Sequence, residues 1–82
     1  MDDRTKKLIA VGASVGANCH PCLEHHVAAA LEAGIDRDDL WMAVEVGKAV
    51  RNGAAASMDK LALHLVRERL PGTRAAGTCG CC

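Results

Sequence analysis

The sequence has 82 residues, the length of one small domain. Ten basic and ten acidic residues give a formal net charge of zero, so no overall field draws the chain to nucleic acid or to an anionic membrane. One tryptophan and no phenylalanine or tyrosine are present, which excludes the stacking platforms of single-stranded nucleic-acid binders. A chain this short buries only about 60% of the surface that its unfolded form exposes, which favours self-association.

Five cysteines, an odd number, form two groups: Cys19 and Cys22, then Cys79, Cys81 and Cys82. They lack the regular spread of a disulfide scaffold, and in a reducing compartment such groups indicate redox or metal chemistry. No apolar stretch approaches the about 18 residues of a membrane-spanning helix, and no clean signal cleavage site follows the first apolar segment. We therefore expect a cytoplasmic protein with no membrane partner.

Helix-forming residues fill the segments between glycine, proline and asparagine, and β-branched runs are missing. We therefore predict an all-α fold, a small helical domain of about four helices. Asp2 and Asp3 begin the first helix, which is expected to end near Ala17. Gly12 and Gly16 lie four residues apart on one face of this helix, where they let another backbone approach closely. The apolar residues expected on its inner side are Leu8, Val11 and Val15.

The next two helices are delimited by caps and turn residues. Asn18 is the expected N-cap of a second helix that begins around Cys19 to Pro21 and ends at Gly34. Asp36 caps the third helix, which we expect to end at Asn52-Gly53. The inner residues of the two helices are expected to be Leu23, Val27, Leu31, Leu40, Trp41, Val44, Gly47 and Val50 or Arg51.

A fourth helix is expected from about Ala54 to Pro71-Gly72, with its apolar side facing the core. Residues 1–72 then form one helical domain, and residues 73–82 form a flexible cysteine-rich tail. Alanine-rich helices bury little area per residue, at about 25 cal/mol per Å², so we expect an obligate homo-oligomer in which a partner subunit covers a second face. The inward residues of the fourth helix are expected to be Met58, Leu61, Leu65 and Val66.

The second helix opens with the motif Cys19-His20-Pro21-Cys22. Unpaired backbone N–H groups and the positive end of the helix dipole stabilise a thiolate there, which lowers a cysteine pKa from about 8.5 to about 3.5–7.5. The spacing lets the two sulfurs form a disulfide within one turn, so the pair can cycle between oxidation states. His25 and His26 lie one turn beyond Cys22, where an imidazole can accept the thiol proton.

A Cys-x-x-Cys motif is also half of many zinc sites, so metal binding is the competing interpretation. The helical part of the chain offers no obvious second pair of ligands. His64 stands alone on the expected fourth helix and is more typical of a surface or packed imidazole. Redox chemistry is therefore favoured over metal binding at Cys19 and Cys22.

The pattern Cys19-x-x-Cys22-x-x-x-His26 resembles the carboxymuconolactone decarboxylase-like superfamily, and specifically its alkyl hydroperoxidase D branch. The resemblance covers residues 9–65 and is also carried by Val27-Ala28-Ala29-Ala30, Gly34 and an acid-rich cap before Leu40–Val50. It implies an all-α fold that assembles as trimers or hexamers. It also implies a thiol redox cycle that requires no cofactor and takes electrons from a thiol protein or a small thiol.

The resemblance also assigns roles to the motif. The second cysteine of the family attacks peroxide and becomes a sulfenic acid, a role that falls on Cys22. The first cysteine resolves the sulfenic acid as a disulfide, which falls on Cys19, and the histidine of the proton relay is His26. Lys7 stands where the family has a relay glutamate, and Pro21 stands where it has a histidine. Thiol–disulfide exchange is therefore a firmer expectation than efficient alkyl hydroperoxide or peroxide reduction.

Other groups could complete the relay. His20, His25 and Glu24 are candidate auxiliary residues, and Glu24 or Glu45 could supply the missing carboxylate. Decarboxylation is less expected, since the members of the superfamily that catalyse it do not depend on a cysteine pair.

The tail carries the second cysteine group, Thr78-Cys79-Gly80-Cys81-Cys82. Three thiols at a flexible end could enter the active site and exchange with the Cys19–Cys22 disulfide. They could equally bind a soft ion such as Cu(I), Zn(II), Hg(II) or As(III). The alternative function is therefore a soft metal or metalloid binding protein, and an assembly module with vestigial thiols is a third.

Overall fold

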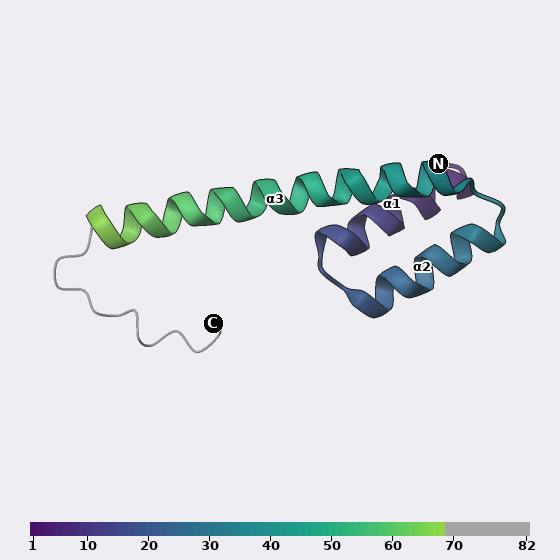
Figure 1. The fold of residues 1–82 in the computed structure, drawn as a ribbon, viewed down its shortest axis with the longest axis horizontal. Coiled ribbons are helices and arrows are strands. Elements are labelled where there is room, and N and C mark those ends of the chain that lie inside the picture. Colours follow the sequence, from purple (N-terminus) through teal and green to yellow (C-terminus); the bar gives the residue numbers. More distant parts are fainter. Residues whose placement is uncertain (69–82) are drawn as a thin grey trace.

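The structure, a computed structural model, describes residues 1–68. This part of the chain forms three helices, α1 (Asp3–Gly16), α2 (His20–Glu32) and α3 (Arg37–Glu68), and contains no strand. The expected all-α class is therefore confirmed. The first half of α3 packs with α1 and α2, whereas its second half extends beyond them as a single helix (Figure 1). No helix of residues 1–68 combines the length and the apolar character needed to cross a membrane.

Glycines set the distance between α1 and α3. A Cβ added at Gly47 of α3 would collide with the carbonyl oxygen of Gly12 and lie 2.9 Å from the Cβ of Val15. A Cβ added at Gly12 would lie 3.0 Å from the carbonyl oxygen of Ala43. The expected close backbone approach at Gly12 is therefore confirmed, and Gly47 is the partner that makes it possible.

A small apolar core lies where the three helices meet. Its buried members come from all three helices and from the connection between α2 and α3, and Ser14 is the buried polar residue beside them. Trp41, an expected inner residue, is instead 58% exposed. Of the alternatives Val50 and Arg51, Arg51 is the half-buried one and Val50 is 64% exposed. The buried apolar residues are Val11, Val15, Ala30, Ile35 and Leu40, surrounded by partly buried Leu8, Leu23, Val27, Leu31, Ala43 and Val44.

Most helix ends follow the sequence signals. The carboxylate of Asp2 accepts a hydrogen bond of 2.7 Å from the backbone N–H of Thr5 and caps α1. Gly34 has a φ of 83° after the end of α2, and Asp36 accepts a hydrogen bond of 3.4 Å from the N–H of Asp38 at the start of α3. A salt bridge from Arg4 to Asp39 also joins the first turns of α1 and α3.

The expected break at Asn52-Gly53 is wrong, because both residues lie inside α3, which is one unbroken helix of 32 residues. Neither residue adopts a positive φ. The alanines at positions 54–56 are strong helix formers, and they offset the cost of about 1 kcal/mol for one glycine in a helix. The described part therefore has three helices rather than four. The expected end at Pro71-Gly72 and the tail of residues 73–82 lie outside the described residues.

The second half of α3 does not face the core of its own subunit, contrary to the expectation for a fourth helix. Every described side chain from residue 52 to residue 67 is exposed. The four residues expected to point inward are 43–64% exposed: Met58, Leu61, Leu65 and Val66. Their apolar surface has no cover within the described part of the chain.

Candidate functional site

The chain turns sharply between α1 and α2. Asn18 adopts a φ of 55°, a left-handed conformation that asparagine tolerates better than most residues. The N–H of Cys19 donates to the carbonyl of Ser14 at 3.0 Å, and the carbonyl of Cys19 accepts from the N–H of Leu23 at 3.0 Å. Cys19, not Asn18, is therefore the N-cap of α2. Asn18 instead accepts a hydrogen bond of 3.2 Å from Arg51 of α3.

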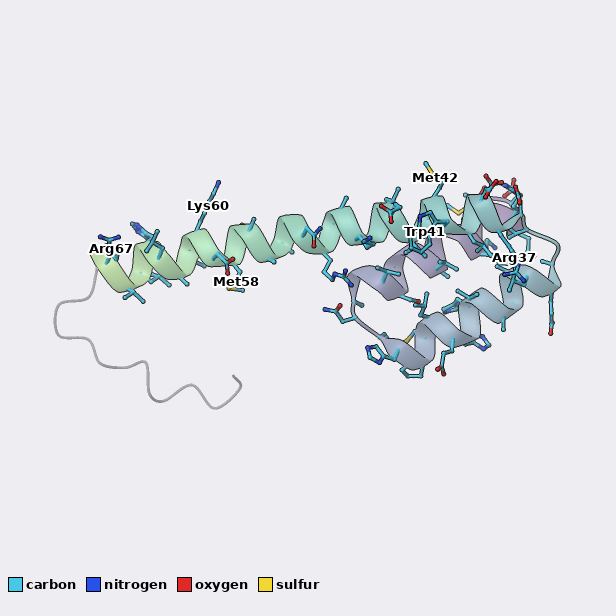
Figure 2. The ribbon with its side chains drawn as sticks, in the orientation of Figure 1. Arg37, Trp41, Met42, Met58, Lys60 and Arg67 are labelled. Atoms are coloured by element: carbon cyan, nitrogen blue, oxygen red, sulfur yellow. A yellow bond between two sulfur atoms is a disulfide. The ribbon has the colours of Figure 1, made fainter. Side chains whose placement is uncertain are left out.

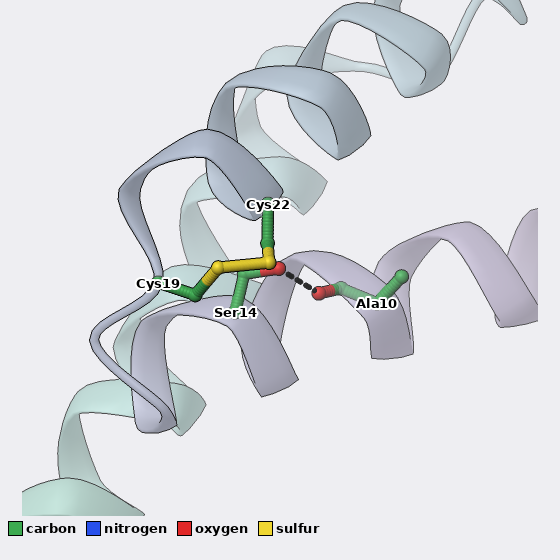
Figure 3. Close-up of a disulfide and its surroundings, with 4 residues drawn as sticks. All are labelled: Ala10, Ser14, Cys19 and Cys22. Atoms are coloured by element: carbon green, nitrogen blue, oxygen red, sulfur yellow. Dashed lines mark hydrogen bonds between the residues drawn. A yellow bond between two sulfur atoms is a disulfide. The ribbon is translucent and has the colours of Figure 1, made fainter.

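Cys19 and Cys22 form a disulfide, with their Cα atoms 5.3 Å apart (Figure 3). Cys22 is exposed, whereas Cys19 is half-buried. Ser14 lies beside the disulfide, and its hydroxyl donates to the carbonyl of Ala10 at 2.7 Å (Figure 3). The two cysteines that the motif singles out are thus joined, and one of the two residues is exposed.

The N-terminus of α2 suits a negative charge. No side chain makes a capping hydrogen bond there, and the first turn contains no acidic residue. Pro21 has no N–H, so the backbone donors of the first turn are those of His20 and Cys22. These donors and the helix dipole favour a thiolate once the disulfide is reduced.

The histidines are spread along the first two turns of α2. His26 is half-buried and lies edge-to-face with His25, with ring centroids 5.0 Å apart. His25 and His20 are exposed. Within residues 1–68 no hydrogen bond joins His26 to either sulfur in this oxidised form. The spacing of four residues places His26 one turn from Cys22, on the same side of the helix.

Two of the residues considered for the relay position, Glu45 and Lys7, form ion pairs along their own helices. Glu45 forms an ion pair of 3.1 Å with Lys48, three residues along α3. Glu24 is exposed and makes no ion pair with any described residue. Lys7 pairs with Asp3 at 2.7 Å and lines a hollow beside the connection from α2 to α3. The assignment of Glu24 or Glu45 as the relay carboxylate therefore stays a prediction.

A pocket of about 250 Å³ lies at the start of α2, and the half-buried Cys19 is one of the residues that line it. Cationic Lys48 and Arg51 of α3 line it together with His20, and no carboxylate lines it. Sequence reasoning did not identify these two cations as functional. Their spacing of three residues places them on one helix face, but only the crossing of α1 and α3 at Gly47 brings that face to Cys19.

Metal chemistry finds no support in the described residues. Within residues 1–68, no three side chains of histidine, cysteine, aspartate or glutamate are grouped so as to hold a metal ion. His64 is exposed on the extended half of α3, as expected for a surface imidazole. The tail cysteines, Cys79, Cys81 and Cys82, lie outside the described residues.

Comparison with known proteins places this site in a family. A protein of Paracoccus denitrificans, "Uncharacterized protein 4 in cox locus", is 35% identical over 68 residues, which are 83% of this chain and 61% of that protein. The chain therefore spans less than two thirds of that relative. No solved structure matches the chain. The sequence model of the carboxymuconolactone decarboxylase family matches residues 1–66, which include α1, α2, the disulfide and nearly all of α3. On that match, the chain belongs to the carboxymuconolactone decarboxylase family.

Proposed function

We propose that the protein is a thiol–disulfide oxidoreductase that cycles Cys19 and Cys22 between a dithiol and a disulfide. The observation that carries this proposal is the disulfide at the uncapped N-terminus of α2, with Cys22 exposed. Family membership supports it, as does the odd and clustered set of cysteines. The same clustering favours the reducing cytoplasm as the place where the cycle runs.

The disulfide is reduced by two thiols of a donor. A donor thiolate attacks one sulfur, the Cys19–Cys22 bond breaks, and a mixed disulfide forms while the other cysteine leaves as a thiolate. The first-turn N–H groups of α2 stabilise that leaving thiolate. A second donor thiolate then attacks the donor sulfur of the mixed disulfide. The donor leaves as its own disulfide, and the pair of cysteines has gained two electrons in total.

Peroxide reduction is the finer form of the proposal. The thiolate of Cys22 attacks the terminal oxygen of a hydroperoxide, the O–O bond breaks, and an alcohol leaves as Cys22 becomes a sulfenic acid. The thiolate of Cys19 then attacks the Cys22 sulfur, the S–O bond breaks, and the hydroxide leaves as water after it takes a proton from solvent, so that the disulfide forms again. We assign the attack to Cys22 because it is the exposed cysteine, and the protonation of the leaving alkoxide to His26.

Two measurements on cysteine variants test the proposal. The background is a chain in which Cys79, Cys81 and Cys82 are serine, so that the tail cannot react. In it, Cys19→Ser should leave Cys22 with a thiol pKa below 8 and should accumulate a peroxide-dependent sulfenic acid that a dimedone probe labels. Cys22→Ser is the matched control and should show no such labelling. A Cys22 thiol of ordinary acidity that neither exchanges nor oxidises would refute the proposal.

The alternative proposal, soft metal or metalloid binding, depends on Cys79, Cys81 and Cys82. Thiolates select soft ions, and three of them occur within four residues. Elemental mass spectrometry of gently purified protein separates the two proposals. Stoichiometric metal that disappears when residues 79–82 are deleted favours metal binding, whereas metal-free protein with a Cys19–Cys22 disulfide favours the redox cycle.

A further inference from the structure

The pair of α1 and α3 has two sides, and α2 covers only one of them. On the other side, an open apolar groove of about 610 Å³ runs between α1 and the first half of α3. Its floor is made of glycine and alanine, including Gly12, Gly16 and Gly47, so a third backbone can approach closely. Ile9, Val46 and Val50 rise at its edges and are 53–64% exposed. The small and apolar residues that line the groove suit the close approach of another helix.

The same chain contains a helical segment with an uncovered apolar face that such a groove could bury. The second half of α3 is wholly exposed, and Ala54, Met58, Leu61 and Leu65 recur along it every three or four residues. This spacing gives one apolar face. Lys60 leaves α3 on the opposite side from Met58 (Figure 2). The extended segment is therefore amphipathic, and its apolar face has no partner among residues 1–68 of its own subunit.

We propose that the second half of α3 from one copy docks in the groove between α1 and α3 of a second copy, and that the two copies exchange these segments about a two-fold axis. The lengths agree. Residues 52–68 extend over about 25 Å at 1.5 Å per residue, and the α1 side of the groove, from Thr5 to Ala17, extends over about 19 Å.

The two apolar surfaces are also continuous. On α3, the groove-lining residues Ala43, Gly47 and Val50 and the stripe from Ala54 to Leu65 follow one another at intervals of three or four residues, so they lie on one face of one helix. A two-fold axis near Ala54 places the two α3 helices antiparallel. The first half of each helix then faces the second half of the other, with Val46 opposite Leu61. Such a contact is self-complementary, as a two-fold interface requires.

The exchange leaves the redox site accessible. The pocket beside Cys19 opens on the other side of α3, through Lys48 and Arg51, whereas the groove uses Val46, Gly47 and Val50. Assembly through this groove is therefore independent of the redox proposal and goes beyond it. The exchange also explains why α3 contains the turn-like residues Asn52-Gly53. They would be the hinge: if the helix broke there, the last segment could fold back into the groove of its own subunit, and if it stays straight, the segment can reach only a second copy.

Sedimentation equilibrium of the 82-residue chain tests the exchange. Leu61→Glu places a charge on the apolar stripe, and Leu63→Glu places the same charge two residues away, on the other side of the helix. The two leucines are 50% and 56% exposed, so they are matched in exposure. We expect an even-numbered assembly for the wild type and for Leu63→Glu, and a monomer for Leu61→Glu, with at least a tenfold weaker association. A monomeric wild type, a trimer, or equal effects of the two variants would overturn the proposal.

A cross-link test does not depend on how Leu61→Glu folds. In a chain whose five native cysteines are serine, Val46→Cys and Leu61→Cys are introduced together. The two positions are about 22 Å apart along one continuous helix, so they cannot join within that helix. Oxidation should give a covalent dimer, whereas Val46→Cys with Leu63→Cys should remain monomeric on denaturing gels. An internal cross-link in a monomer would show instead that the chain folds back at Asn52-Gly53, and would overturn the exchange.

Discussion

Replacement of Gly47 by alanine should separate α1 from α3 and destabilise the protein. The new Cβ would meet the carbonyl oxygen of Gly12 and would lie 2.9 Å from the Cβ of Val15, and neither neighbour is the flexible end of a side chain. Overpacking of this kind costs about 1–3 kcal/mol. Because one of the two contacts is with a backbone carbonyl, we expect a cost at the upper end of this range, about 3 kcal/mol. Alanine regains about 1 kcal/mol of helix propensity relative to glycine. The free energy of unfolding should therefore fall by about 2 kcal/mol.

Gly53→Ala is the matched control, since it is the same change in the same helix. A Cβ at Gly53 meets nothing within 4 Å, so only the gain in propensity of about 1 kcal/mol applies. Thermal unfolding followed by circular dichroism, at one fixed protein concentration, measures both variants. For a chain of this size the melting temperature should fall by about 8–16 °C in Gly47→Ala and rise by about 4–8 °C in Gly53→Ala. Shifts of the same sign would refute the packing argument.

Three further predictions concern the turn, the first helix and the pocket. Asn18→Ala should destabilise the protein by about 1 kcal/mol more than Asn18→Gly in urea unfolding, because both lose the hydrogen bond from Arg51 but only alanine strains at a φ of 55°. Hydrogen bonding by the side chain and the backbone N–H of Thr5 holds the pKa of Asp2 below its ordinary value. The stability that this carboxylate contributes is therefore present above the ordinary aspartate pKa of about 3.9 and is lost as the pH falls through the lowered pKa. Asp2→Asn should therefore reduce the loss of unfolding free energy between about pH 5 and pH 2, measured by urea unfolding at each pH. Lys48→Ala should raise the KM for a carboxylate-bearing thiol such as mercaptoacetate by about threefold or more, with no change for neutral mercaptoethanol. Equal changes for both thiols would argue against a role for charge in the pocket.

The helical class and most of the helix ends could be predicted because they depend on local chemistry. Asp2, Gly34 and Asp36 act where the sequence signals place them, since a cap or a left-handed glycine needs only its own neighbours. Asn18 shows the limit of this reasoning. Its short amide suits both an N-cap and a left-handed turn residue, and the structure uses it in the turn, so the cap moves by one residue to Cys19.

Features that depend on distant contacts could not be predicted in this way. Asn52-Gly53 has the composition of a turn, but whether the chain turns there depends on what the following helix can pack against. The cysteine pair follows from its spacing, whereas the cations Lys48 and Arg51 reach Cys19 only because two glycines allow α1 and α3 to cross so closely. The expected role of Glu45 as a relay carboxylate stays untested, and in this structure its partner is Lys48.

The unbroken course of α3 has a mechanical consequence. Arg51, in the middle of this helix, holds the side chain of Asn18 at 3.2 Å, one residue before Cys19. The extended half of the helix begins immediately after it. Because an α-helix resists bending over a few turns, α3 should move as one rigid rod about its contact with α1 at Gly12 and Gly47. A displacement of its far end would then act, through the hydrogen bond from Arg51 to Asn18, on the turn that carries Cys19.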